Sequence, residues 1–186
     1  MNEEKELIER AKKGEHAAFN MLAKKYIERI YWHALRMLGE HNDADEVTQE
    51  VLIVIYNKLS TFNFESNLYT WIYKITSTRC LNLIRKRNIQ RFFSFDSFDD
   101  LGDGGNFEDN LIEELENREK IKNIEKALQT LPAKQRQVFV LRHYDGLNYE
   151  EISEITGNKI GTLKANYFHA LNKVIERVKW QLMKKY

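Results

Sequence analysis

Apolar side chains recur at intervals of three and four residues along most of the chain, which is the period of the inward face of a helix. The pattern predicts helices over residues 3–13, 15–38 and 43–62, then from Ser66 or Asn67 to about Lys86, and again over 110–130. The chain contains only one Pro and eight Gly, too few for a many-stranded β fold. We therefore expect an all-α protein.

Residues 131–175 have the pattern of a four-part helical unit whose last two helices form a helix-turn-helix. Asn148 can cap a helix with Glu151 at the capping-box position, and Gly157 can provide the turn that follows. The next helix has an apolar stripe that includes Leu163 and Val174, while its outward side chains are small, polar or basic. Such a face could lie in a DNA major groove, although an ordinary helical hairpin fits the same periodicity.

Charge is divided into blocks that the net charge of +1 conceals. Residues 71–91 contain six bases and no acid, residues 92–119 contain ten acids and one base, and residues 159–186 contain seven bases and one acid. Merely solvated helix faces explain this alternation less well than two cationic surfaces separated by an acidic connector, so nucleic acid is the favoured class of partner.

The acidic block also marks the domain organisation. Residues 91–110 lack helical periodicity, and we expect them to form a flexible acidic linker between two small helical domains at 1–90 and 111–186. The C-terminal domain contains the helix-turn-helix.

The helix before the linker interleaves aromatic rings with Lys and Arg. Bases of a single strand stack on such rings while cations follow the phosphates, so this helix is a candidate for single-stranded nucleic acid. Its inward positions are expected to include Leu68 and Ile72, with Tyr73 and Ser77 on other faces. Trp71 could equally be a core residue, and Cys80 is interpreted as a packing residue.

Several classes of function find no support in the sequence. No apolar run approaches the roughly 18 residues of a membrane span, and the N-terminus lacks a secretory signal, so a cytoplasmic protein is expected. No Gly-rich phosphate loop, metal-ligand spacing or nucleophile–base set is present. We expect no catalytic residue, no metal and no cofactor.

In its motifs the chain resembles a bacterial RNA polymerase sigma factor of the extracytoplasmic-function type. The resemblance rests on GEHAAFNMLAKKY, DADEVTQEV and ESNLYTWIYKI in the N-terminal half, and on LPAKQRQVFVLRHYDGLNYEEISEITG and GTLKANYFHAL in the C-terminal half. It implies a region 2 domain that binds core polymerase and opens the minus-ten element, and a region 4 domain that reads the minus-thirty-five element. The implied partners are core RNA polymerase (its largest-subunit clamp helices and its flap), promoter DNA and an anti-sigma factor.

The resemblance also implies three sets of contact residues. The core polymerase-binding set is Asp45, Glu46, Gln49 and Glu50. The minus-ten set is Phe64, Ser66, Asn67, Tyr69, Trp71, Tyr73, Lys74, Ser77, Thr78 and Arg85. The minus-thirty-five set is Thr162, Lys164, Ala165, Asn166, Phe168, His169 and Lys173.

Departures from the family pattern leave the promoter sequence open. Thr78 stands where the family often has Asn, and Ala165-Asn166 replaces a common Ser-Arg pair, with His169 at a frequent Arg position. Two rival hypotheses remain. One is a stand-alone helix-turn-helix regulator, and the other is a sigma-like protein that occupies polymerase without reading DNA.

Overall fold

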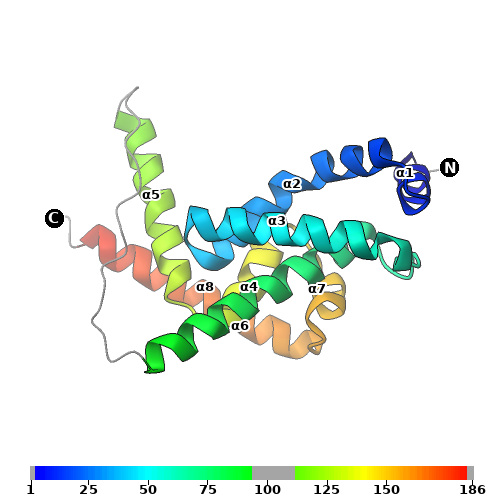
Figure 1. Cartoon of the computed structure of the whole chain (residues 1–186). Coiled ribbons are helices and arrows are strands. Elements are labelled where there is room, and N and C mark those ends of the chain that lie inside the picture. Colours follow the sequence, from blue (N-terminus) through cyan, green and yellow to red (C-terminus); the bar gives the residue numbers. More distant parts are fainter. Residues whose placement is uncertain (1–2, 94–111, 184–186) are drawn as a thin grey trace.

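The computed structural model describes residues 3–93 and 112–183, and all regular structure in these two segments is helical (Figure 1). The first segment contains α1 (Glu3–Lys12), α2 (His16–Leu38), α3 (His41–Lys58), the short η1 (Leu59–Thr61) and α4 (Leu68–Phe93). The second contains α5 (Ile112–Gln129), α6 (Ala133–Phe139), η2 (Val140–Tyr144), α7 (Tyr149–Thr156) and α8 (Ile160–Met183). The prediction of an all-α fold with two helical domains is confirmed.

The N-terminal core lies where α2, α3 and α4 pack together, with α1 lying against α2. Ile30, Met37 and Val51 are fully enclosed there, and Cys80 joins them from α4. Burial raises the pKa of the Cys80 thiol to about 12, so this group stays protonated at neutral pH and behaves as a small apolar side chain.

The C-terminal core is divided between two clusters around α6. Leu128, Phe139 and Val174 join α5, α6 and α8, while Leu141, Ile152 and Leu163 join η2, α7 and α8. η2 is a single π-helical turn, so the chain widens between α6 and the turn that leads to α7.

The predicted capping box at the start of α7 is present. The Asn148 side chain accepts a hydrogen bond from the Glu151 amide at 2.8 Å, and the Glu151 carboxylate accepts one from the Asn148 amide at 2.8 Å. The helix then ends at Gly157, whose φ of +71° is the left-handed conformation that glycine adopts cheaply.

Replacing Asn148 with Ala should lower the free energy of unfolding by about 1 kcal/mol, the usual effect of removing an N-cap. Chemical denaturation followed by circular dichroism measures the change. Asn57→Ala is a suitable control because Asn57 is exposed in the last turn of α3 and caps nothing. Equal effects of the two substitutions would contradict a stabilising cap at Asn148.

Two predicted boundaries were wrong. α4 continues to Phe93 rather than ending near Lys86, because the sequence RNIQRFF offers neither Gly nor Pro to stop it. α3 begins at His41, two residues before the expected Asp43. Of the proposed linker, residues 94–110 lie outside the described residues, so its predicted flexibility stays a prediction.

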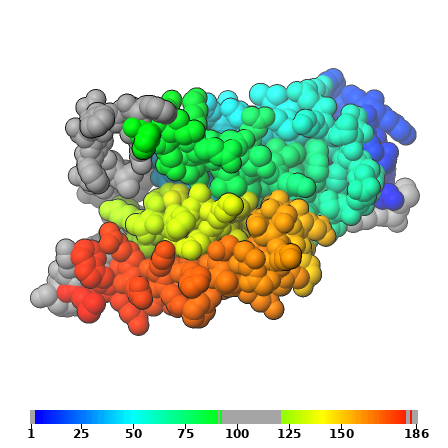
Figure 2. Space-filling model, turned by 90° about the horizontal axis from the view of Figure 1, so that it is seen from below, coloured from blue at the N-terminus to red at the C-terminus, as the bar shows by residue number. Residues whose placement is uncertain are grey.

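The two halves of the molecule lie against each other as adjacent layers (Figure 2). α4 contacts α6 and α7, and α2 contacts α5, α6 and η2. The faces of α2 and α4 that do not serve the N-terminal core are therefore partly covered by the C-terminal domain. This packing decides which candidate site residues are exposed.

Candidate nucleic-acid and protein interfaces

The outward face of α8 is exposed, as the helix-turn-helix pattern predicts. Thr162, Lys164, Ala165, Phe168, His169 and Lys173 are exposed, and Asn166 is partly exposed. On the opposite side Leu163, Ala170 and Val174 are buried against the rest of the domain. All seven predicted minus-thirty-five residues thus lie where a ligand could reach them.

Lys164, in the first turns of α8, lies beside the aromatic ring of Tyr149. Its ammonium lies 5.7 Å from the centre of the Tyr149 ring, and the Arg142 guanidinium lies 5.1 Å from the same ring. The Tyr149 ring, at the start of α7, therefore attracts two cations, Arg142 and Lys164, next to the outward face of α8. Tyr149 and Arg142 were not among the predicted site residues, because nothing in the helical periodicity relates them to Lys164.

The loop between η1 and α4 forms an aromatic cluster. The Phe62 ring is buried, and it lies 5.0 Å from the Phe64 ring and 5.5 Å from the Trp71 ring, between centroids. Phe64 has a φ of +62°, the only positive φ of a non-glycine residue in the described segments. Such backbone strain persists only where the surroundings hold it, and it often marks a functional loop. Trp71 is half-buried and packs against the N-terminal core, while part of its side chain stays accessible.

The other predicted minus-ten residues differ in exposure. Asn67, Lys74, Thr78 and Arg85 are exposed, and Ser66 and Tyr69 are half-buried. Tyr73 and Ser77 are buried, with 5% and 1% of their surface exposed. We expected these two residues to lie off the inward face of α4. They belong instead to a second buried face of this helix, which packs on the C-terminal domain.

That second face centres on a buried histidine. Nδ1 of His33 lies 2.6 Å from a carboxylate oxygen of Asp145, and Nε2 lies 3.0 Å from the Ser77 hydroxyl. His33 is on α2, Ser77 on α4, and Asp145 follows η2, so one imidazole joins both domains. The Tyr73 ring packs at 5.3 Å from the imidazole, and burial raises the pKa of its hydroxyl. We call His33, Tyr73, Ser77 and Asp145 the interdomain seam.

Two further contacts join the N-terminal and C-terminal domains. The Tyr69 hydroxyl donates a hydrogen bond to Glu151, which raises the pKa of that phenol. The Arg136 guanidinium donates to the carbonyl of Met37 at 2.6 Å, and to the carbonyls of Gln129 at 2.7 Å and Leu131 at 3.2 Å. Arg136 thus ties the end of α2 to the end of α5, and burial lowers its pKa to about 10.

The acidic face of α3 lies away from the seam. Asp45, Glu46 and Gln49 are exposed, and Glu50 forms an ion pair of 3.3 Å with Arg79 of α4. Ile53 and Tyr56 continue the same face one and two turns further and remain exposed. The result is an acidic surface that ends in two apolar side chains.

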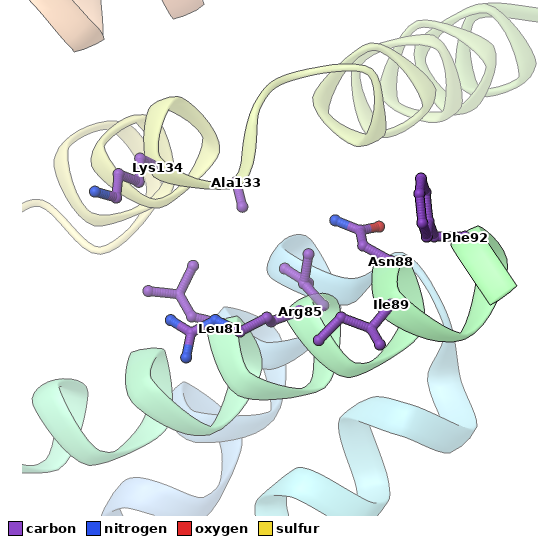
Figure 3. A pocket seen from close by; sticks show the side chains of 8 residues that line it. Leu81, Arg85, Asn88, Ile89, Phe92, Ala133 and Lys134 are labelled. Carbon is purple, nitrogen blue, oxygen red and sulfur yellow. The ribbon is translucent and has the colours of Figure 1, made fainter.

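A mostly apolar hollow of about 380 Å³ separates the C-terminal part of α4 from the start of α6 (Figure 3). Leu81 and Ile89 of α4 line it with Ala133, and the side chains of Arg85 and Lys134 lie at its edges. Arg85 therefore borders this hollow instead of the aromatic cluster before α4.

None of the helices in the two described segments combines the length and apolar character that a membrane crossing requires.

Comparison with known proteins identifies the family. Residues 22–89 match the model of sigma-70 region 2, and residues 121–174 match that of sigma-70 region 4. The ECF RNA polymerase sigma-E factor of Escherichia coli strain K12 is 31% identical over 180 residues, which cover 92% of each chain. The RNA polymerase sigma-H factor of Pseudomonas aeruginosa is 28% identical over 176 residues, 90% of each chain.

Solved structures share the fold. The sigma factor RpoE, in complex with the anti-sigma factor NepR from Bartonella quintana, superimposes with a TM-score of 0.72 at 24% identity, over 87% of this chain and 96% of that one. CnrH, in complex with the cytosolic domain of CnrY, gives 0.71 at 17% identity, over 96% of this chain and 98% of that one. The protein belongs to the sigma-70 family of RNA polymerase sigma factors, and within it to the extracytoplasmic-function type.

Proposed function

We propose that this sigma factor binds core RNA polymerase through the acidic face of α3, captures the minus-ten element with the loop and exposed face around α4, and reads the minus-thirty-five element with α8. The observation that supports the proposal is that the acidic face of α3, the loop before α4 with the exposed side of that helix, and the outward face of α8 are three separate exposed surfaces. They include the exposed members of the three predicted contact sets, whereas Tyr73 and Ser77 are buried in the interdomain seam. Residues 1–90 would act as the region 2 domain, 111–186 as the region 4 domain, and 91–110 as the linker between them.

Charge supports this assignment of partners. The α3 face is acidic and suits a basic protein surface, here proposed to be the clamp helices of the largest polymerase subunit, with the flap receiving the C-terminal domain. The exposed cations Lys74, Lys164 and Lys173 suit phosphates. The protein would perform no chemistry itself, would need no metal or cofactor, and would act in the cytoplasm.

An anti-sigma factor is the further proposed partner. The solved structures of RpoE and CnrH each contain a second protein, named as an anti-sigma factor in the complex with RpoE. A partner of this kind would hold the present chain inactive until a signal releases it. Co-purification of a tagged full-length chain from its own cells would test for such a protein.

Run-off transcription from fragmented genomic DNA tests the function. Core polymerase with the full-length chain should initiate at a small set of sites, and core polymerase alone should not. Gel shifts with and without core enzyme distinguish a stand-alone regulator, which would bind duplex promoter DNA tightly by itself. Initiation that does not depend on the added protein would rule the proposal out.

Replacing Lys164 and Asn166 together with Ala should reduce promoter-specific transcription about tenfold, since base contacts in the major groove typically discriminate by such factors. Both side chains are on the outward face of α8. Glu176→Ala, an exposed position further along the same helix, provides the control. Unchanged transcription by the double variant would favour a protein that occupies polymerase without reading DNA.

A further inference from the structure

The aromatic loop before α4 receives two cations from the N-terminal helix. The ammonium of Lys5 lies 5.3 Å from the centre of the Phe64 ring, and the ammonium of Lys12 lies 5.0 Å from it. Lys5 and Lys12 are seven residues apart, which places them two turns apart on one face of α1. α1 also contacts η1, directly before the loop.

The two lysines have different surroundings. Lys12 donates a hydrogen bond of 2.9 Å to the Phe62 carbonyl and lies 3.6 Å from Glu9. It therefore fastens the loop to α1. Lys5 is exposed, and among the described residues no carboxylate lies within ion-pair distance of it. Its charge is held at the Phe64 ring without being neutralised there.

Two like charges beside one ring repel each other, and a ring face attracts a cation only weakly at an exposed site. Glu9 offsets the charge of Lys12, whereas Lys5 has no such partner among the described residues, so an anion beside Lys5 would be favourable. An aromatic ring next to an unpaired cation is the combination that binds single strands, because the ring stacks on a base and the cation holds the adjoining phosphate. The Phe64 residue that carries this ring also has the positive φ of +62°.

We propose that Lys5 of α1 is an additional minus-ten contact, which binds a backbone phosphate of the single-stranded DNA beside the Phe64 loop. Lys12 acts as a positioning residue that holds the loop through the Phe62 carbonyl. This assignment rests on the proposed function of the loop and adds α1 to its DNA-binding surface. The ligand class is a phosphodiester of single-stranded DNA.

The test measures binding of holoenzyme to a promoter obtained from the run-off experiment. The template has its nontemplate strand unpaired over the minus-ten element and carries a fluorophore. Lys5→Gln should weaken binding about three- to tenfold and lower the slope of log affinity against log salt by about 0.7, the value for one phosphate of a single strand. Lys5→Arg should retain both values.

Lys13→Gln is the matched control, since Lys13 is exposed directly after α1 and is not one of the two cations at Phe64. If Lys5→Gln and Lys13→Gln give the same affinity and the same salt slope, Lys5 does not bind a phosphate. If wild-type holoenzyme itself fails to bind the template, the proposed function of the loop fails as well, so the two failures are distinguishable. An unchanged melting temperature of the Lys5→Gln variant shows that the fold is intact.

Discussion

Replacing Arg136 with Met should lower the free energy of unfolding by about 3 kcal/mol, because it leaves buried acceptors without a donor. The Arg136 side chain is buried and donates to three backbone carbonyls, those of Met37, Gln129 and Leu131. Two of these belong to the end of α5 and its exit, and one belongs to the end of α2. Carbonyls at helix ends carry partial negative charge, which the guanidinium offsets.

Met has nearly the volume of the arginine stem but no donor, so the substitution isolates the hydrogen bonds. Arg136→Lys should show an intermediate loss, because one ammonium cannot reproduce the planar fork that reaches both helix ends. Lys134→Met serves as the control, since Lys134 is exposed on the same helix. The measurement is urea denaturation of the full chain. A change below about 1 kcal/mol would mean that the desolvation of the guanidinium cancels its hydrogen bonds.

The second large effect is expected at the interdomain seam. Truncating His33 or Asp145 to Ala should each cost about 2 kcal/mol, since either change leaves a buried polar partner unpaired. In the double variant the two losses should not add, because one interaction is lost in both single variants. The coupling energy from the four proteins should be about 1 to 2 kcal/mol.

A surface hydrogen bond to histidine gives the matched control. Tyr31 Oη and His41 Nδ1 lie 2.5 Å apart at an exposed site within the N-terminal domain, and His41→Ala should change stability little. Amide hydrogen exchange shows which residues are protected by the interdomain seam. The α4 residues 69–78 should lose protection in His33→Ala and Asp145→Ala but keep it in His41→Ala. Additive effects of the two seam substitutions would show that His33 and Asp145 do not interact in solution.

The elements that could be predicted from sequence are those whose signals are local. The α7 capping box needs only Asn148 and Glu151, three residues apart, and Gly157 ends the same helix by its own backbone preference. The outward face of α8 follows from helical periodicity, because its core-facing residues belong to one stripe. Exposed site residues on a single helix are therefore predictable.

The seam could not be predicted, because it depends on contacts between residues far apart in the chain. His33 and Asp145 are separated by 112 positions, and nothing in the sequence around either residue points to the other. Tyr73 and Ser77 lie off the apolar stripe of α4, so periodicity assigned them no partner. They are buried only because a second domain packs on that face.

The same reasoning applies to α1. Its Lys5 and Lys12 have the pattern of a solvated helix, and only the fold brings them to Phe64, more than fifty residues further along the chain.

The end of α4 was misplaced for a different reason. A fall in apolar periodicity after Lys86 indicated a linker, but a helix end requires a stop signal, and none occurs before Phe93.

Burial of Tyr73 and Ser77 has an energetic consequence for the chain on its own. If single-stranded DNA binds only when this face of α4 is uncovered, the measured affinity equals the intrinsic affinity multiplied by the fraction of molecules that are open. A closed state favoured by about 2.8 kcal/mol would reduce that affinity about a hundredfold. Any protein that binds only the open state, with the two domains separated, would restore the full affinity for single-stranded DNA without contacting the DNA itself. The contacts that hold the two halves together would then limit unproductive binding to exposed single strands elsewhere in the genome.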